Sequence, residues 1–247
     1  MSKTIIIIPS RMAATRLRGK PLLEINNKPI ISHVVDKAKF SGIGEVFVAT
    51  EDQEIIDVVN QNGGKAILTG KHKTGTDRIF EAFKTLKLTD IDYVLNIQGD
   101  EPAIEVKDII NLNDLMIKNN SEIGTLAADI KENNIMENEN IVKVITNEKL
   151  ISNNFPKALN FFRKNFSIKS NNIYHHIGIY CYKVSTLKKF VSFNQTKNET
   201  ANKLEQLRAL DNGIKINLAL ASNSPIGVDT MEDYLELKKI MEYKSKI

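Results

Sequence analysis

The most informative stretch of the sequence is YVLNIQGDEP, residues 93–102. The mostly apolar residues from Tyr93 to Ile97 form a strand pattern, which a glycine, two acidic residues and a proline bring to an end. Such a strand is typical of a buried parallel sheet, where ligands bind beyond the carboxyl ends of the strands. Asp100 is therefore predicted at a ligand-binding edge. A carboxylate there usually holds a divalent cation, and a cation beside a nucleotide indicates phosphate chemistry.

Short apolar strands alternate with helical patterns through the first half of the chain, which predicts βαβ units and a mainly parallel sheet. Strands are expected at residues 5–8, 45–50, 65–68 and 93–97, and helices at residues 29–40, 52–62 and 77–86. After residue 120 the order changes. Strands are expected at residues 123–130, 141–146, 177–183 and 214–221, and helices at residues 184–193, 203–211 and 231–243, with a loop at 131–140 and an irregular segment at 149–172.

The fold expected from this pattern is α/β, with a mixed, mainly parallel sheet flanked by helices. We expect one domain over residues 1–247, with a partly antiparallel insertion near residues 124–184. Such an insertion is a common place for dimer contacts.

Composition limits the class of partner. The net charge is only +4, and no Lys/Arg run is long enough for a nucleic-acid arm, so an anionic small substrate is expected rather than nucleic acid. The single Cys181 excludes an internal disulfide and indicates the reducing cytoplasm. No segment has the roughly 18 uninterrupted apolar residues of a membrane span. The apolar run at residues 4–8 is too short for a signal peptide, and no membrane association is expected.

The loop after the first strand, PSRMAATRLRGKPL at residues 9–22, combines small and cationic side chains. Small residues such as Ser10, with Ala13 and Ala14, let backbone N–H groups approach a polyphosphate. Cations neutralise its charge, and Arg11, Arg16 and Lys20 supply them. The glycines of a Walker or dinucleotide-binding loop are missing. The loop therefore predicts a polyphosphate site, and the alternative is a solvated basic loop.

A second candidate site is the helix start Gly75-Thr76-Asp77-Arg78. A helix N-terminus attracts an anion or a base edge. The simpler alternative is an ordinary helix cap formed with the preceding Thr74.

Asp229, which opens the last helix, is a possible partner for Asp100. An aspartate at this position is more often an N-cap. If both carboxylates instead converge on one cation, they make a magnesium site that phosphate oxygens and water complete.

Two further segments contain candidate ligands for a polyol or a carboxylate. His175 and His176 are adjacent on a strand, so they point to opposite faces and are not expected to share a metal. Glu205 and Gln206 lie in a helical turn between inward-facing leucines. They are either surface residues or readers of hydroxyl groups at the edge of a cleft.

Together these segments resemble the 3-deoxy-manno-octulosonate cytidylyltransferase family, also called CMP-Kdo synthetases. The matching segments extend from residue 5 to residue 234 and read IIIIPSRMAATRLRGKPL, HKTGTDR, NIQGDEP, HHIGIYCY, LEQLRAL and GVDTMEDY. The resemblance implies a nucleotide-diphospho-sugar transferase fold, a homodimer, Mg²⁺ as cofactor, and CTP and a 2-keto-3-deoxy sugar acid as substrates.

The resemblance also implies a role for each matching residue. Catalysis would depend on Lys20, Arg11, Asp100 and Asp229, the two aspartates holding Mg²⁺. The nucleotide would contact Ser10, Arg11, Arg16, Lys20, Gly75, Thr76 and Arg78. The sugar acid would contact Gln98, His176, Tyr180, Glu205 and Gln206.

The sequence departs from the family pattern at three places. Arg18 stands where the family usually has proline, Phe155-Pro156-Lys157 where it has Phe-Ser-Arg, and residues 198–203 differ from its usual Ser-Pro-Leu-Glu start. The last two departures lie on the sugar side. The family's nucleotide-binding residues can therefore be assigned in this sequence more directly than its acceptor.

The expected function is transfer of CMP from CTP to 3-deoxy-D-manno-octulosonate (Kdo), with release of pyrophosphate, for lipopolysaccharide biosynthesis. One alternative keeps the reaction but changes the acceptor to an amino-substituted Kdo or a sialic acid. Another is a non-catalytic CTP-binding subunit.

Overall fold

The computed structural model describes residues 2–13, 16–131, 133–164, 170–225 and 227–244. Ala14, expected among the small residues of the basic loop, lies outside the described residues. The chain packs into two compact units, one made of residues 3–109 and 225–247 and the other of residues 110–224. The predicted single domain with an insertion at about 124–184 stays a prediction.

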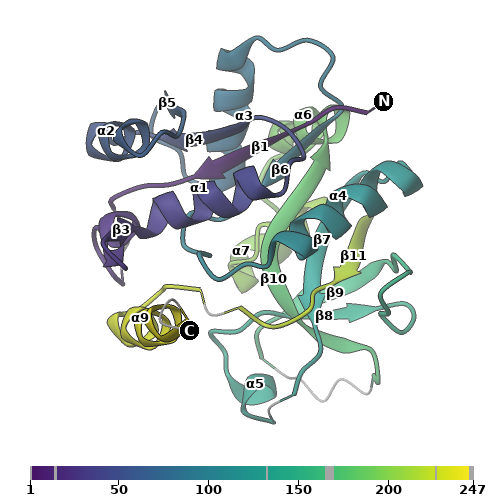
Figure 1. The fold of residues 1–247 in the computed structure, drawn as a ribbon. Helices are drawn as coiled ribbons and strands as arrows, with labels where there is room; N and C mark the ends of the chain where they lie inside the picture. The colour runs from purple at the N-terminus through teal and green to yellow at the C-terminus, as the bar shows by residue number, and fades with distance from the viewer. Residues whose placement is uncertain (1, 14–15, 132, 165–169, 226, 245–247) are drawn as a thin grey trace. The chain divides into compact units, whose positions relative to one another are not determined.

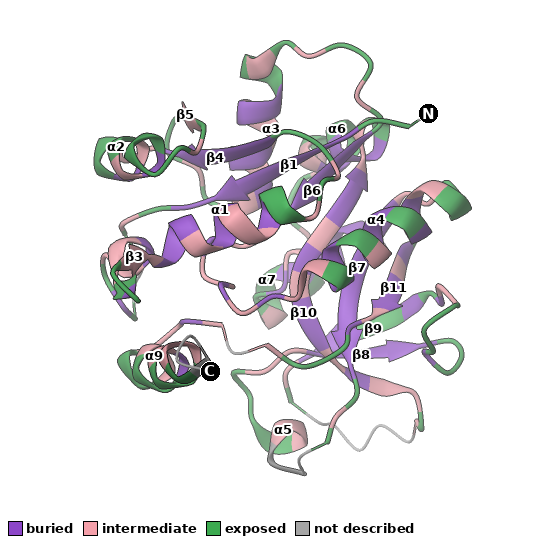
Figure 2. Ribbon diagram, in the orientation of Figure 1, coloured by how far each residue is buried: buried purple, intermediate pink, exposed green. Residues whose placement is uncertain are grey.

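The first unit contains a parallel sheet in the order β6-β1-β4-β5 (Figure 1). Its strands are β1 (Thr4–Pro9), β4 (Val46–Thr50), β5 (Ala66–Leu68) and β6 (Tyr93–Asn96). All residues of β1, β4 and β6 are buried (Figure 2), as expected for strands covered on both faces. Ile7 pairs with Asn96, and Pro9 with Ala49, so the three strands end at one edge. The loops that follow β1 and β6 therefore leave the sheet side by side.

Helices α1 (Ile30–Phe40), α2 (Gln53–Gln61) and α3 (Gly75–Leu86) pack on this sheet. The predicted apolar stripe of α1, which includes Val34 and Ala38, is buried. The basic loop continues into a short 3₁₀ helix η1 (Lys20–Leu22) and the two-stranded ribbon β2 (Glu24–Ile25) and β3 (Lys28–Pro29).

A small apolar cluster joins the basic loop to the C-terminal helix α9 (Met231–Lys244). Its buried members are Leu17, Ile25, Ile30, Val228 and Leu237. Burial of these side chains ties residue 228, and hence its neighbour Asp229, to the loop that contains Lys20.

The second unit has the strand order β11-β7-β10, extended from β10 to β8 and β9. These strands are β7 (Ile123–Ala128), β8 (Lys143–Thr146), β9 (Ala158–Phe162), β10 (Ile173–Lys183) and β11 (Ile216–Leu220). Only the β11–β7 pair is parallel, and the other described pairs are antiparallel. The predicted antiparallel character of this part of the chain is confirmed.

Between β6 and β11 the described helices are short apart from α4 (Val106–Asn119), in which the boundary between the units falls. The others are α5 (Asn133–Glu137), α6 (Val184–Ser192), α7 (Lys197–Asn202) and α8 (Gln206–Asp211).

Several predicted elements were wrong. The loop expected at residues 131–140 contains α5, and the irregular segment at 149–172 contains β9, whose residues carry little apolar alternation. The helix expected at 203–211 is present as α8 but begins only at Gln206. The preceding helix α7 was not predicted, and it ends where Lys203 adopts a left-handed backbone conformation, with φ at +52°. Helix α4 was not predicted. The other expected helices and strands are confirmed, with shifts at their ends.

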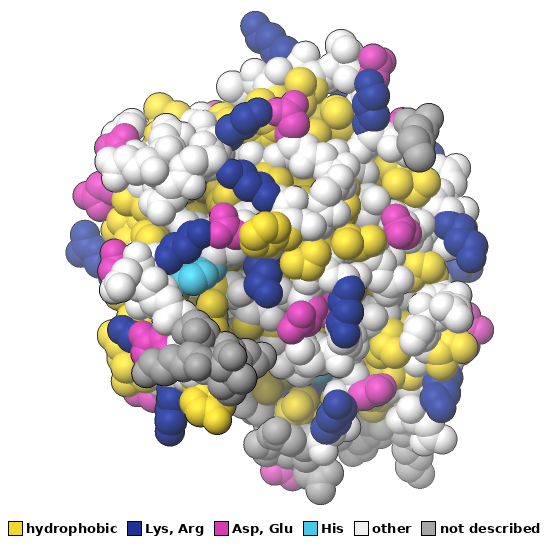
Figure 3. Space-filling view, viewed as in Figure 1, with side chains coloured by type: hydrophobic (Ala, Val, Ile, Leu, Met, Phe, Trp, Pro, Cys, Tyr) yellow, Lys and Arg dark blue, Asp and Glu magenta, His cyan; other side chains and the backbone are white. Residues whose placement is uncertain are grey.

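No helix in the described part of the chain is long and apolar enough to cross a membrane. On the face drawn in Figure 3, Lys and Arg side chains are interspersed with Asp and Glu. This mixed pattern agrees with the small net charge of +4.

Candidate active site

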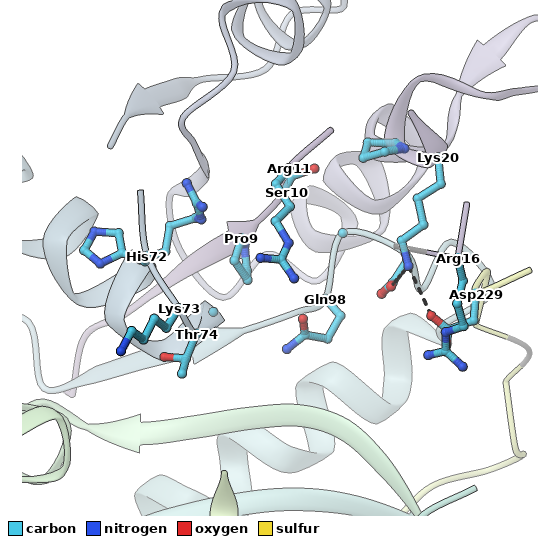
Figure 4. A pocket seen from close by; sticks show the side chains of 15 residues that line it. Pro9, Ser10, Arg11, Arg16, Lys20, His72, Lys73, Thr74, Gln98 and Asp229 are labelled. Carbon is cyan, nitrogen blue, oxygen red and sulfur yellow. Dashed lines mark hydrogen bonds and ion pairs between the residues drawn. The ribbon is translucent and has the colours of Figure 1, made fainter. Parts of the chain in front are cut away.

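A cavity of about 300 Å³ opens at the carboxyl edge of the first unit's sheet (Figure 4). It is lined by Pro9, Ser10, Arg11, Arg16, Lys20, Pro21, His72, Lys73, Thr74, Gly75, Arg78, Gln98, Gly99, Asp100 and Asp229. The structure therefore brings together every residue predicted for the nucleotide and the metal, except the buried Thr76. Gln98, predicted for the sugar acid, also lines this cavity.

The ends of β1 and β6 approach closely, and Gly99 makes this possible. A Cβ atom on Gly99 would lie 3.0 Å from the carbonyl oxygen of Pro9 and 3.3 Å from Ser10 Oγ. Ser10 Oγ is buried and has no hydrogen-bond partner among the described residues. A buried hydroxyl of this kind at a cavity wall is suited to a polar ligand atom.

The basic loop is held in place by its backbone. The Met12 N–H donates to Asp52 Oδ2 at 2.7 Å, and the Gly19 N–H donates to the Met12 carbonyl at 3.1 Å. Gly19 has a φ of +74°, a left-handed conformation that glycine adopts without strain. This closed loop places Lys20 at the cavity.

The ammonium of Lys20 joins the two aspartates that the sequence singled out. Its Nζ donates to Asp100 Oδ2, to the Val228 carbonyl at 2.9 Å and to Asp229 Oδ1 at 3.3 Å. Burial alone would lower the pKa of Lys20, but the charges and hydrogen bonds of Asp100 and Asp229 raise it overall. Lys20 is therefore a fixed cation between two carboxylates.

Asp229 is not the N-cap of α9, so the N-cap interpretation of its position is wrong. Thr230 caps the helix instead, because Asp233 N–H donates to Thr230 Oγ1 and Thr230 N–H donates to Asp233 Oδ2. The Asp229 carboxylate faces the cavity, where Arg16 Nη2 lies 2.8 Å from Oδ2 (Figure 4).

Glu101 is a feature of the site that the sequence analysis missed, although it stands next to Asp100. Its Oε2 atom is buried without a hydrogen-bond partner among the described residues. Burial, and then the charges of Asp100 and Asp229, raise the pKa of Glu101 to about 8, although Lys20 opposes the shift. The carboxyl of Glu101 is therefore mostly neutral at pH 7.

The start of α3 is an ordinary helix cap that also lines the cavity. Thr74 caps the helix by accepting a hydrogen bond from Asp77 N–H at 3.1 Å, as the simpler interpretation predicted. Arg78 lines the cavity, but its guanidinium is engaged by Glu51 at 3.0 Å and by Thr69 Oγ1 at 2.8 Å. Its role as a nucleotide ligand stays a prediction.

The loop before α3 adds two cavity residues with basic side chains, His72 and Lys73. His72 pairs with Glu81, which also accepts hydrogen bonds from the Gly70 N–H at 3.1 Å. The hydrogen bond from His72 is the main cause of the lowered pKa of Glu81. Lys73 was not predicted, because an isolated lysine in a polar loop has no distinguishing pattern.

A second cavity, of about 70 Å³, lies in the second unit. It is lined by Ile123, Tyr180, Tyr182, Phe190, Glu205, Gln206, Ala209 and Ile216. Three residues predicted for the sugar acid, Tyr180, Glu205 and Gln206, therefore share one wall, with aromatic rings beside them. Gln98 belongs to the other unit.

His176, also predicted for the sugar acid, is buried behind Tyr180, whose ring centre lies 5.6 Å away, and is not among the lining residues. Thr125 Oγ1 donates to the Ile179 carbonyl at 2.7 Å, so it accepts from His176 Nε2 at 3.0 Å. Burial, with the charges of His175 and Arg163, lowers the pKa of His176 to about 3. The ring is therefore neutral, and it supports Tyr180 from behind.

The aspartates fit the magnesium ion that the resemblance implies. Oxygens of Asp100 and Asp229 face one point, since both contact the Lys20 ammonium, and carboxylate oxygens are the ligands that Mg²⁺ prefers. Within the described residues no group of three or more His, Cys, Asp or Glu is arranged for a metal ion. Two carboxylates with oxygens of a bound phosphate are the donor set that remains.

Comparison with known proteins agrees with this geometry. The cytidylyltransferase family model matches residues 5–216. A 3-deoxy-manno-octulosonate cytidylyltransferase of Thermodesulfovibrio yellowstonii is 47% identical, over 93% of this chain and 94% of that protein. The protein of the same name from Bartonella tribocorum is 40% identical, over 96% and 98%.

A solved structure shows the same fold. It is a CMP:2-keto-3-deoxy-manno-octonic acid synthetase complexed with CTP, with 34% identity, a TM-score of 0.88, and coverage of 98% of this chain and all of that one. The predicted fold class is thereby confirmed. From its sequence and its fold, the chain belongs to the cytidylyltransferase family, and within it to the 3-deoxy-manno-octulosonate cytidylyltransferases.

Proposed function

We propose that this chain is a nucleotidyltransferase that joins CTP to Kdo, giving CMP-Kdo and pyrophosphate, for lipopolysaccharide biosynthesis. The main support for this proposal is that the basic loop, the start of α3 and both aspartates line one cavity. Cations for a triphosphate and carboxylates for its metal ion are there on one sheet edge. The names of relatives at 47% and 40% identity support the choice of acceptor.

The reaction forms a bond between the anomeric hydroxyl oxygen of Kdo and the α-phosphorus of CTP. The bond from the α-phosphorus to the bridging oxygen breaks, and pyrophosphate leaves. Positioning and charge neutralisation carry most of the catalysis in reactions of this kind.

Lys20 and Arg11 neutralise the charge that builds on the leaving pyrophosphate. Arg16 adds a cation at the same wall, and the start of α3, at Gly75, offers backbone N–H groups to a phosphate or to the base. Asp100 and Asp229 would hold Mg²⁺, which supplies polarisation of the α-phosphate and a lowered pKa for the attacking hydroxyl. Lys20 contacts both aspartates and lines the same cavity as Arg11 and Arg16, so the carboxylates that would hold Mg²⁺ and the cations for the phosphates are adjacent.

The acceptor is proposed to contact Tyr180, Glu205 and Gln206 in the second unit. The departure from the family pattern at residues 198–203 is smaller in the structure than in the sequence. Thr196 and Glu199 form a capping box at the start of α7, and the Ser and Glu of the family's Ser-Pro-Leu-Glu have the same spacing and chemistry. This supports Kdo over another sugar acid.

We further propose a cytoplasmic homodimer. Cys181 is buried and unpaired, which suits a reducing compartment. Exposed apolar side chains in the second unit, Leu159 at 60% and Ile151 at 50%, offer surface for a second copy. Sedimentation equilibrium of the purified chain tests the dimer, and a monomer at micromolar concentration would contradict it.

Pyrophosphate release tests the function. The purified chain is assayed with each nucleoside triphosphate against Kdo, amino-substituted Kdo and a sialic acid, with and without Mg²⁺. We expect release only with CTP and Mg²⁺, and the highest kcat/KM with Kdo. A higher kcat/KM with another acid would replace the acceptor, and CTP binding without release would identify a non-catalytic subunit.

A further inference from the structure

A buried ion pair joins helices α7 and α8 in the second unit. The side chains of Glu199 and Arg208 are each only 4% exposed. Arg208 Nε lies 2.8 Å from Glu199 Oε2, and Nη2 lies 2.5 Å from Oε1, so the contact is bidentate. Burial would raise the pKa of Glu199, but the hydrogen bonds and charge of Arg208 lower it overall. The pair is therefore ionised, and each ion depends on the other.

Arg208 also reaches two residues that line the second cavity. Its Nη2 lies 3.7 Å from Glu205 Oε1, and its guanidinium carbon lies 5.1 Å from the centre of the Phe190 ring. Both Glu205 and Phe190 line the cavity, whereas Arg208 does not. The planar guanidinium of Arg208 thus forms a bidentate ion pair with Glu199, attracts Glu205 and makes a cation–π contact with Phe190. A lysine ammonium does not reproduce this set of contacts.

The charge of Arg208 matters because of the proposed ligand. A sugar acid carries a carboxylate, and Glu205, which lines the same cavity, would repel it. A guanidinium behind Glu205 offsets that repulsion and leaves the Glu205 oxygens as acceptors for sugar hydroxyls. The aromatic neighbours Tyr180 and Tyr182 cannot supply this charge.

We propose that Arg208, anchored by Glu199, is a positioning residue for the acceptor: it fixes and electrostatically balances Glu205 and Phe190 at the wall that receives the sugar acid. This inference rests on the proposed function, which assigns the second cavity to the acceptor. It adds Arg208 and Glu199 to the residues on which acceptor affinity depends, although neither lines the cavity.

The chain contains a matched control for this pair. Asp211, at the end of α8, accepts hydrogen bonds from Thr196 Oγ1 at 2.5 Å and from Asn198 Nδ2 at 3.1 Å. These bonds also join α7 to α8, but they are exposed and involve no cavity residue. Asp211→Asn therefore weakens the same helix pair without changing the wall.

The experiment compares wild type, Arg208→Lys and Asp211→Asn by KM for Kdo, KM for CTP, kcat and Tm. For Arg208→Lys we expect the KM for Kdo to rise at least about tenfold, the factor that corresponds to one hydrogen bond to a charged group. The KM for CTP and kcat should change less than about threefold, because the nucleotide residues are untouched. Asp211→Asn should keep the wild-type KM for Kdo even where its Tm falls.

An unchanged KM for Kdo in folded Arg208→Lys would overturn the inference, and so would an equal rise in Asp211→Asn. If Arg208→Lys does not fold, Glu199→Asp, which keeps both charges but moves the anchor by one methylene, is judged by the same criteria. A wild-type chain that uses no sugar acid would instead refute the proposed function, and the inference with it. Failure of the variants alone would refute only the inference.

Discussion

Replacing Lys20 by Met should have opposite effects on metal binding and on catalysis. In the free protein the Lys20 ammonium occupies the point that the oxygens of Asp100 and Asp229 face. A metal ion must displace it, whereas in Lys20→Met the carboxylates are open. The same substitution removes a cation that the proposed reaction needs for its leaving group.

The structure sets the size of each effect. A hydrogen bond between charged groups contributes about 1.5–3 kcal/mol, or about 10- to 150-fold in a binding constant. The side chains of Asp100 and Asp229 are 29% and 49% exposed, so solvent screens the contact, and we expect the lower end. Lys20→Met should therefore bind Mg²⁺ about tenfold more tightly without nucleotide. Its kcat should fall at least about 100-fold, as for other lost electrostatic contacts to a transition state.

Isothermal titration of Mg²⁺ into the nucleotide-free protein measures the first effect, and steady-state pyrophosphate release the second. Lys28→Met is the control, because Lys28 pairs with Asp36 outside the cavity. It should leave both values unchanged. If Lys20→Met binds Mg²⁺ no more tightly than wild type, Lys20 does not compete with the metal ion at these aspartates.

Two further predictions concern stability. Gly99→Ala should lower the free energy of unfolding by about 1–3 kcal/mol, because its Cβ would lie 3.0 Å from the Pro9 carbonyl oxygen. Urea unfolding measures this change. An unchanged midpoint would show that the ends of β1 and β6 can separate without cost. His176→Gln, which keeps a donor toward Thr125, should flatten the pH dependence of stability. The pKa of His176 is about 3 in the folded chain against an ordinary value of 6.5, so the unfolded chain binds the extra proton. Wild type therefore loses stability as pH falls below about 6.5, by up to about 1.4 kcal/mol per pH unit. Equal slopes for the two proteins in urea unfolding between pH 7 and pH 5 would contradict the buried, neutral histidine.

Much of the fold could be predicted because its signals are local. The β-branched run in β1 and the stripe of α1 each specify one element. Helix α5 and strand β9 could not be predicted, because α5 is only five residues long and β9 has two adjacent exposed residues rather than strict alternation. Such short elements depend on the strands beside them, and those contacts are distant in sequence.

The residues of the candidate site also divide into those with a local sequence signal, which were predicted, and those without one, which were not. Asp100 and the basic loop were found because each follows a strong strand, and parallel strands end at one edge. Glu101 and Arg208 were missed because their importance comes from burial and from partners. Glu199 lies nine residues before Arg208, beyond the spacing that a single helix turn brings together. Whether Asp229 caps a helix could be decided only when Thr230 and Asp233 were seen to perform that task.

Formation of CMP-Kdo by Asp100→Asn tests whether the Asp100 and Asp229 carboxylates hold the metal ion for cytidylyl transfer. The product is quantified by ³¹P NMR from CTP, Kdo and Mg²⁺, with Asp36→Asn as a control outside the cavity. We expect a rate for Asp100→Asn at least about 1,000-fold below wild type, with an unchanged fold by circular dichroism and a normal rate for Asp36→Asn. A rate for Asp100→Asn within a few-fold of wild type would show that its carboxylate does not hold a catalytic metal ion.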